Sequence, residues 1–253
     1  MEIRCWMKHN FLKLNEKKTE YILISSPHMR NSITGTSLSV GDEAVTPSDK
    51  ARNLGVIFDR AMSMDKHISY VCQSTYYQLR RIAEIRRFLT RAAAENLIHA
   101  LITSRLDFCN SLFAGLPSSA IKRLQAVQNA AARLLTGTRK FDHISPILHE
   151  LHWLPVQQRV QYKILLLTFK ALHNQSPNYI SSLISVRHLR PGLRSAGLCL
   201  QIPNTRLKTY GDRTFSSVAP RLWNSLPTHL RNCDKLDTFK LQLKTYLFQR
   251  ISD

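Results

Sequence analysis

The acidic residues of the chain are scattered, and this limits the metal chemistry that the sequence can support. Two-metal phosphoryl transfer needs carboxylates that cluster around a pair of Mg²⁺ ions. The sequence contains no Asp-Asp pair and no Asp-x-Asp, and most acids stand beside basic residues. Asp59 and Asp107 are the acids that could be recruited, although a single Asp at the end of a strand or helix is more often a cap. We therefore predict no catalytic residue and no metal site.

Three histidines form a second group with chemical potential. His143, His149 and His152 stand near Glu150, and on a helix residues 149 and 152 would share a face that suits a metal. No cysteine or carboxylate pattern completes a four-ligand site, so we favour a structural role in the turn before Pro155. The nucleophile motif Gly-x-Ser-x-Gly and the phosphate-binding loop Gly-x-x-x-x-Gly-Lys are also absent.

Basic residues gather in two segments, one around residues 80–87 and one at 122–140, and no acid occurs from Ala120 to Phe141. Two helices with basic outer faces can follow a phosphate backbone, and tyrosines beside them can stack on bases or contact ribose. For any single Lys or Arg, a solvated helix face is the simpler interpretation. Taken together, the predicted nucleic-acid-binding residues are Tyr77, Arg80, Arg81, Arg86, Arg87, Lys122, Arg123, Gln125, Asn129, Arg133, Arg139 and Lys140.

The elements that must position these residues follow from hydrophobic periodicity. Apolar residues at helical spacing predict helices from Asp65, from Thr90 to Leu112, from Ser118 to Leu135, from Pro155 to Asn174, from Phe215 to Ser225 and from Leu236 to Arg250. The helix from Pro155 is apolar almost all round, which indicates a central core helix. The first 60 residues indicate strands, at Thr19–Ser25, in a hairpin over 38–45 around Gly41-Asp42, and at Leu54–Phe58. Residues 187–213 indicate loops with a short strand at Leu198–Ile202.

Net charge points to the class of partner. The 253 residues include 36 Lys and Arg against 17 Asp and Glu, which gives a net charge of +19 and a pI of about 10.2. An excess of this size indicates a polyanionic partner, and nucleic acid is favoured over a membrane surface because no basic amphipathic terminus occurs. No membrane span or secretory signal is expected. Five widely spaced cysteines without Cys-x-x-Cys indicate a reducing, intracellular compartment, either cytoplasm or nucleus.

A set of sequence blocks occurs in a specific order along nearly the whole chain. The blocks are Trp6 to Glu20 (W-x-x-x-N-x-L-x-L-N-x-x-K-T-E), Asn53 to Asp59 (N-L-G-V-x-F-D), Ser104 to Asn110 (S-R-L-D-F-C-N), Leu124 to Arg133 (L-Q-x-x-Q-N-x-A-A-R), Leu151 to Lys163 (L-H-W-L-P-V-x-x-R-x-x-Y-K), Tyr210 to Phe215 (Y-G-D-R-x-F) and Leu222 to Pro227 (L-W-N-x-L-P). In this order they resemble reverse transcriptases of non-LTR (LINE-type, jockey-like) retrotransposons.

The resemblance implies an α+β, mostly helical chain. It predicts a small β palm remnant at 1–62, a helical thumb at 63–140, and a mixed, Arg-rich C-terminal domain at 141–253. In the family the metal-binding aspartates lie upstream of the block at Trp6, so Met1 is expected to stand downstream of them. The chain would then be a fragment without its own polymerase activity and without a cofactor, Mg²⁺ belonging to the full-length enzyme. The thumb would bind RNA or an RNA–DNA template–primer.

Two other hypotheses remain open at this point. The chain could be the non-functional remnant of a degenerate mobile element, with exposed palm strand edges that favour aggregation. It could instead support polymerase activity only together with the missing upstream half of the enzyme.

Overall fold

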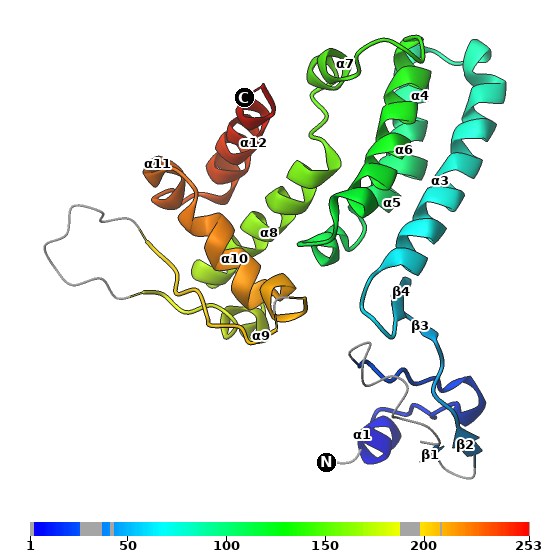
Figure 1. The fold of residues 1–253 in the computed structure, drawn as a ribbon, viewed down its shortest axis with the longest axis vertical. Helices are drawn as coiled ribbons and strands as arrows, with labels where there is room; N and C mark the ends of the chain where they lie inside the picture. The colour runs from blue at the N-terminus through cyan, green and yellow to red at the C-terminus, as the bar shows by residue number, and fades with distance from the viewer. Residues whose placement is uncertain (1–2, 26–36, 41–42, 188–197, 208, 253) are drawn as a thin grey trace, which may run out of the picture. The chain divides into compact units, whose positions relative to one another are not determined.

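The chain is mostly helical, with two small antiparallel sheets (Figure 1). The computed structural model describes residues 3–25, 37–40, 43–187, 198–207 and 209–252. These residues form two compact units, Met1–His67 and Ile68–Asp253, which we call unit 1 and unit 2. The expected α+β, mostly helical class is confirmed at this level. The expected three-part division at residues 62 and 140 stays a prediction, since both sides of 140 belong to unit 2.

Unit 1 contains the two sheets. Helix α1 (Ile3–His9) and the 3₁₀ turn η1 (Glu16–Lys18) precede two antiparallel hairpins, β1 (Leu38–Val40) with β2 (Glu43–Val45), and β3 (Lys50–Asn53) with β4 (Val56–Asp59). In the first hairpin Leu38 pairs with Val45 and Val40 with Glu43, so the predicted hairpin is confirmed. Its predicted turn at 41–42 lies outside the described residues.

The strand predicted at Leu54–Phe58 is confirmed as β4, with its start shifted to Val56, and the strand predicted at Thr19–Ser25 is wrong. Leu54 does not begin a strand: Leu54 and Gly55 form the turn between β3 and β4, with φ angles of 45° and 87°. These positive φ values match the two-residue turn that joins twisted antiparallel strands. Among the described residues, the segment Thr19–Ser25 makes one isolated bridge, from Tyr21 to Pro47, in place of a strand.

Unit 2 consists of helices joined by short connections. Their bounds are α3 (Asp65–Ile85, which starts at the end of unit 1), α4 (Arg91–Ile98), α5 (Ser104–Asp107), α6 (Ser118–Thr136), α7 (Ser145–Glu150), α8 (Val156–Leu172), α9 (Asn178–Ser181), α10 (Phe215–Asn224), α11 (Thr228–Arg231) and α12 (Leu236–Ser252). Short 3₁₀ turns follow α3 at Arg86–Phe88 (η2), follow α5 at Asn110–Phe113 (η4), and precede α10 at Gly211–Arg213 (η5). The helices predicted from Asp65, Ser118, Pro155, Phe215 and Leu236 are confirmed.

The helix predicted from Thr90 to Leu112 is not continuous. Thr90 caps α4 by accepting from the N–H of Ala93, as predicted. A π-helical segment at His99–Thr103 follows, and after α5 the chain breaks at Cys109, which has a φ of 51°. Apolar periodicity continues across the break, so the pattern alone predicts one helix. The structure instead has a helical run over 91–107, with a π-helical segment inside it, and then the 3₁₀ turn η4 at Asn110–Phe113.

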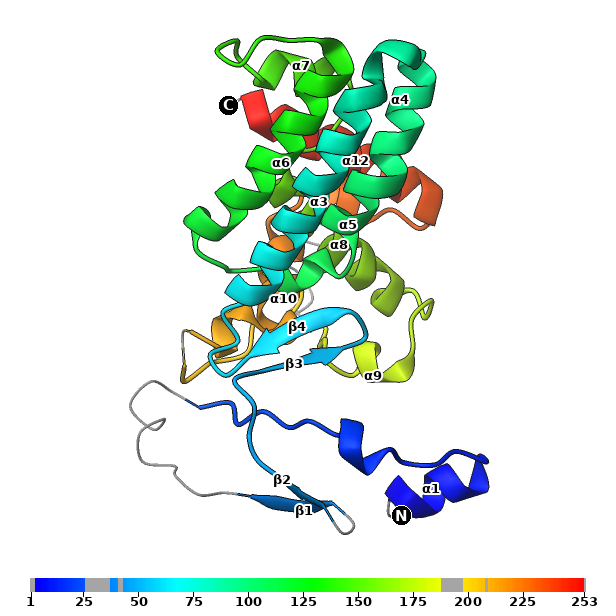
Figure 2. The ribbon, with the colours of Figure 1, turned by 90° about the vertical axis from the view of Figure 1, so that its right-hand side faces the viewer.

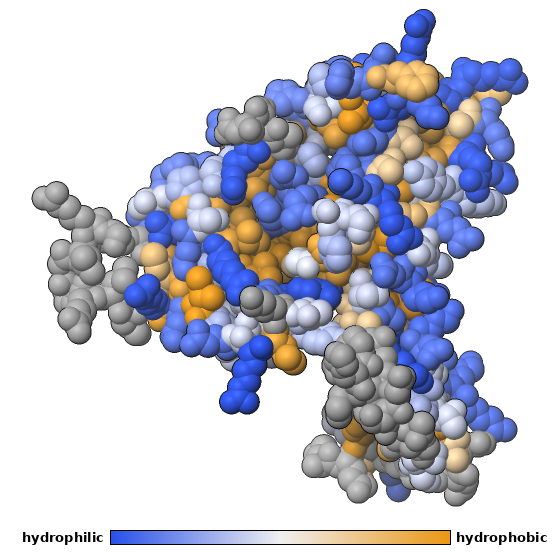
Figure 3. All heavy atoms as spheres, viewed as in Figure 1, coloured by the Kyte–Doolittle hydropathy of each residue, from blue (hydrophilic) through white to orange (hydrophobic). Residues whose placement is uncertain are grey.

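Helix α8 lies at the centre of unit 2, as its apolar sequence predicts. It buries Val160, Ile164 and Phe169 and packs against α6, α10 and α12. The Phe169 ring stacks on Phe239 of α12 at a centroid distance of 4.4 Å, beside the fully buried Trp223 of α10. In Figure 3 apolar side chains gather over this part of unit 2. Within the described part of 187–213, the expected strand at Leu198–Ile202 is reduced to a bridge between Val186 and Leu200.

Candidate nucleic-acid interface

Helices α3 and α6 lie side by side and run in the same direction (Figures 1 and 2). Near their N-terminal ends, Nη2 of Arg123 donates to Oγ of Ser69 at 2.7 Å. At the other end, Arg86 follows α3 and reaches the last turn of α6, where its guanidinium donates to the carbonyls of Leu134 and Leu135. The two helices are therefore joined near both of their ends, and we treat their outer sides as one surface.

The outer side of this surface is basic and aromatic. On α3, Ile68, Val71, Thr75, Leu79 and Ile82 are buried, which turns the opposite side of the helix outward. Tyr77 is 51% exposed, and Tyr76 and Arg80 are exposed on the same helix. On α6, Lys122 and Arg123 are exposed, and the helix contains no acidic residue. We call the surface formed by Tyr76, Tyr77, Arg80, Arg87, Lys122 and Arg123 the α3–α6 face.

Tyr76 lies one turn after Cys72 on α3. Burial raises the pKa of its hydroxyl, and the adjacent Cys72 thiol raises it further. Burial also raises the pKa of Cys72, while the Arg123 guanidinium on α6 opposes that effect. Both groups therefore stay protonated at neutral pH, so neither adds a negative charge to this part of the surface.

The remaining basic candidates differ in how they are held. The guanidinium of Arg87 lies 4.6 Å from the centroid of the exposed Phe88 ring. Arg81 stands 3.8 Å from Glu84, which partly offsets its charge. Beyond the end of α6, Arg139 is exposed and Nζ of Lys140 lies 5.9 Å from the Phe141 ring.

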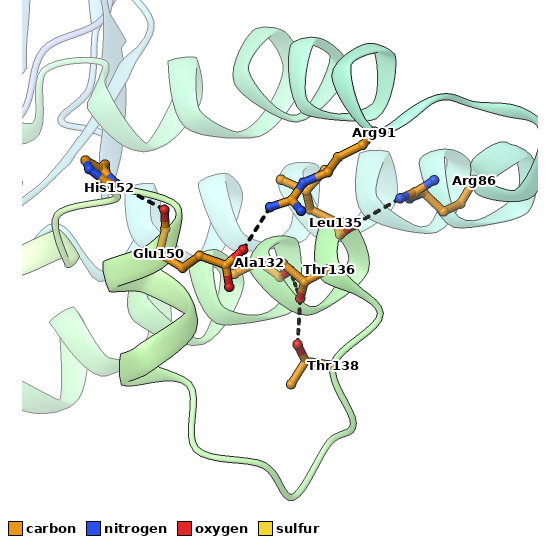
Figure 4. A network of polar contacts seen from close by, with 8 residues as sticks. All are labelled: Arg86, Arg91, Ala132, Leu135, Thr136, Thr138, Glu150 and His152. Carbon is orange, nitrogen blue, oxygen red and sulfur yellow. Dashed lines mark hydrogen bonds and ion pairs between the residues drawn. The ribbon is translucent and has the colours of Figure 1, made fainter.

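Arg86 is placed inside the protein's own hydrogen-bond network (Figure 4). Its three guanidinium nitrogens donate to the backbone carbonyls of Leu89, Leu134 and Leu135 at 3.1, 3.3 and 3.0 Å. The last carbonyls of a helix have no partner within the helix, and a cation there also interacts favourably with the helix dipole. Arg86 therefore holds the end of α6 and joins it to α3.

Arg133 is occupied in a similar way. Its guanidinium donates to the carbonyls of Arg139 and Asp142, at 3.3 and 3.1 Å, and so orders the loop after α6. Gly137 ends the helix with a φ of 73°, and its N–H donates to the Arg133 carbonyl.

Gln125 and Asn129 lie on the inner side of α6. Oε1 of Gln125 accepts from the N–H of Val156 at 2.8 Å, which caps the start of α8. Its amide nitrogen donates to the side chains of Gln128 and Asn129. The fully buried Gln128 in turn donates to the Leu154 carbonyl at 2.9 Å. These amides attach the turn before α8 to α6.

The same turn is held from its other side by an ion pair. Arg159 of α8 bonds Oδ2 of Asp107 at 2.7 Å and donates through Nε to the Leu154 carbonyl at 2.8 Å. Three of the blocks named above, at 104–110, 124–133 and 151–163, therefore meet at this junction. Neither the junction nor the Asp107–Arg159 pair was predicted from the sequence. The spacing of the polar residues in those blocks was the one sequence feature that could have indicated them.

The other residues with chemical potential take structural positions. Asp59 accepts from the N–H groups of Ala61, Ser63 and Met64, at 2.9 to 3.0 Å, and closes the turn after β4 as a cap. Glu150 pairs with Arg91 at 3.1 Å (Figure 4). In the part of the chain that the structure describes, no three His, Cys, Asp or Glu side chains group closely enough to hold a metal ion. None of the described helices combines the length and apolarity needed to cross a bilayer.

No protein-family model matches the chain, and neither a curated protein nor a solved structure matches it.

Proposed function

We propose that the chain binds an RNA-containing duplex through the α3–α6 face, as a non-catalytic part of a non-LTR retrotransposon reverse transcriptase. The observation that carries the proposal is the parallel pair of helices whose outer sides present tyrosines and exposed basic groups. Glu84 is the one acid between Arg80 and Arg87, and α6 contains no acid. The ordered sequence blocks support the family, and the net charge of +19 supports a polyanionic partner.

The spacing of Arg80 on α3 and Arg87 in the following turn η2 suits a phosphate backbone. Arg80 and Arg87 are seven residues apart, which is about 10 Å along a helix axis. Phosphates along one strand advance by roughly 3.4 Å per nucleotide, so the two guanidinium groups can contact phosphates about three nucleotides apart. Lys122 and Arg123 extend the charge sideways onto α6, and the Tyr77 ring offers a stacking or ribose contact.

Five of the residues predicted from the sequence stand outside the proposed contact surface. One of them is Arg81, whose charge is partly offset by Glu84 at 3.8 Å. Arg86, Gln125, Asn129 and Arg133 use their side-chain groups on carbonyls, amides and N–H groups of the protein itself. Recruiting them to nucleic acid would break those bonds, and a buried backbone group left without a partner costs about 1–3 kcal/mol. The proposed contacts are therefore restricted to the α3–α6 face, with Arg139 and Lys140 at its end.

The test is binding of a labelled RNA–DNA hybrid, followed by fluorescence anisotropy over a range of salt concentrations. The test variant carries Arg80→Glu, Arg87→Glu and Lys122→Glu. The matched control carries Lys170→Glu, Lys235→Glu and Arg250→Glu, which lie elsewhere on unit 2. Each reversal removes two positive charges, so both variants have a net charge of +13 in place of +19.

We expect the test variant to lose most of its affinity while the control retains it. Three lost phosphate contacts should also make the log–log salt slope shallower by about 2–3, at roughly 0.9 per contact. Equal losses in both variants would mean that the positive charge acts diffusely. Negligible binding by the unmodified chain at low salt would favour the non-functional remnant. Primer extension by the chain with Mg²⁺ and dNTPs would contradict the assignment of a non-catalytic part.

A further inference from the structure

A second cationic site lies away from the α3–α6 face, at the junction of α5, η4, α8 and α12. It is a cavity of about 290 Å³ whose lining includes Asp107, Asn110, Arg159, Tyr162, Lys163 and Lys244. These residues come from four elements, His152 and Leu154 of the turn before α8 complete the lining, and all belong to unit 2. Ligand sites of small molecules begin at roughly this size.

The charges in the cavity do not cancel. Arg159 is neutralised by Asp107 at 2.7 Å, and the pair is fixed by the further bond from Arg159 to the Leu154 carbonyl. Lys163 and Lys244 have no acidic side chain within 4 Å among the described residues, which leaves the cavity with two positive charges. Both lysines are on long helices, α8 and α12, that pack against each other. A doubly negative group bound between the two ammonium groups would neutralise both of their charges.

A buried amide gives the site a second kind of recognition. Asn110 is only 2% exposed, and its Oδ1 has no hydrogen-bond partner in the described part of the chain. Its Nδ2 makes one long bond, at 3.4 Å, to Oδ1 of Asp107. A buried acceptor without a partner costs free energy, and a hydroxyl group of a ligand in this cavity would supply the missing donor.

Tyr162 adds a neutral donor beside the lysines. Burial raises the pKa of its hydroxyl, and this outweighs the opposing effect of the nearby Lys240 ammonium. The hydroxyl therefore keeps its proton at neutral pH and can donate to an anionic oxygen.

We propose that this cavity binds a phosphate monoester that also carries a hydroxyl group, such as a nucleoside monophosphate or the phosphorylated end of a nucleic acid strand. The phosphate lies between Lys163 and Lys244 and accepts from Tyr162, and the hydroxyl donates to Asn110. The Asp107–Arg159 pair forms the fixed wall of the site. The proposal does not depend on nucleic-acid binding by the α3–α6 face.

The test is isothermal titration of the full chain with inorganic phosphate, with AMP and with adenosine. The variants are Lys163→Gln and Lys244→Gln, and the matched control is Lys170→Gln on the same helix α8, outside the cavity lining. We expect AMP to bind more tightly than phosphate and adenosine to bind weakly. Each lysine variant should weaken the affinity for AMP by about tenfold or more, because it removes a charge-assisted contact. Lys170→Gln should leave the affinity unchanged.

Asn110→Leu separates a binding role from a merely structural one. Leucine has a similar shape and removes the unpartnered acceptor, so the folded protein should keep its melting temperature or gain slightly. The preference for AMP over inorganic phosphate should fall, while inorganic phosphate itself binds as before. If Asn110→Leu binds AMP with the same affinity as the unmodified chain, the proposed hydroxyl contact to Asn110 is wrong.

Two oligonucleotides of one sequence, with a 5′-phosphate or a 5′-hydroxyl, identify the source of the phosphate. Tighter binding of the phosphorylated strand, lost in Lys163→Gln, would assign the site to a strand end, and equal binding of the two strands would assign it to a free nucleotide. Absence of saturable binding by phosphate or AMP at physiological salt, or equal weakening by Lys163→Gln and Lys170→Gln, would overturn the proposal. The charge reversals on the α3–α6 face should leave AMP affinity intact, so failure of either proposal can be recognised separately.

Discussion

Arg86 and Arg87 are neighbours of one residue type whose surroundings give them different roles. Arg87 points to solvent beside the Phe88 ring, whereas Arg86 turns toward the C-terminal end of α6. The sequence placed both in a basic cluster, because composition describes how many charges a segment has and not where each side chain ends. The role of each arginine depends on whether carbonyls without a helical partner lie within its reach. Those that Arg86 reaches belong to Leu134 and Leu135, nearly 50 positions further along the chain.

We predict that Arg86→Gln destabilises unit 2 by about 1–3 kcal/mol, the cost of leaving partly buried carbonyls without a charged donor. Arg86→Lys should recover only part of the loss, because an ammonium lacks the planar fork that reaches three carbonyls. Chemical denaturation followed by the fluorescence of the buried Trp223 measures the change. Arg87→Gln is the control and should stay within about 0.5 kcal/mol of the unmodified chain. Equal effects of the two substitutions would contradict the capping role.

Elements whose pattern is continuous could be predicted from the sequence, and elements that depend on a single backbone reversal could not. Helices α3, α6, α8 and α12 follow from apolar spacing, since the pattern persists over several turns. The break at Cys109 and the turn at Leu54-Gly55 each require a positive φ at a residue that does not favour it. Leucine and cysteine carry no turn signal, so only the tertiary structure shows these reversals.

Leu54→Asn should stabilise the β3–β4 hairpin. Leu54 has a φ of 45° and is 89% exposed, so it pays the cost of a left-handed backbone without gaining burial. Asn adopts this conformation more readily, and Asn-Gly is the preferred pair for such a turn. We expect a gain of about 1 kcal/mol, the lower end of the left-handed penalty for an L-residue. The gain in stability would be measured as slower hydrogen exchange of the β3 and β4 amides, because the hairpin opens less often.

Leu54→Val makes the complementary comparison. A β-branched residue is still less suited to positive φ, so the same amides should exchange faster than in the unmodified chain. Slower exchange in both variants would mean that the gain comes from losing an exposed leucine and not from turn geometry.

At the scale of the whole molecule, the blocks that carry the family resemblance meet inside unit 2. Asp107, Gln128 and Arg159 come from three blocks and converge on the turn around Leu154. Their types and order could be read from the sequence, but their partners could not. Gln128 and Leu154 are 26 positions apart, Asp107 and Arg159 are 52 apart, and only the bond from Arg159 to Leu154 is local. The basic helices of the candidate site were predictable from apolar spacing, as the core helices were. The cavity beside Asn110 was not predictable, because its lining residues come from several separate elements.

The two units are stabilised by different means, and this difference sets their response to pH. Unit 2 has an extended apolar core, whereas the described part of unit 1 buries only Val56, Asp59, Met64 and His67. His67 is 2% exposed, and its Nδ1 accepts from the N–H of Ile57 in β4 at 3.4 Å. Burial lowers the pKa of the His67 imidazole below its ordinary value of 6.5, and the nearby Arg52 lowers it further.

We therefore predict that mild acid loosens unit 1. Because the pKa is lower in the folded state, the unfolded chain binds more protons as the pH falls through about 6.5, and unit 1 loses stability there. The loss continues until the pH passes below the folded pKa. Protection of the Ile57 amide, measured by hydrogen exchange and corrected for intrinsic rates, should fall between pH 7.5 and 5.5. In His67→Gln, whose side-chain oxygen can still accept from Ile57 but does not titrate, protection should stay level. A parallel fall in both proteins would assign the pH response to other groups.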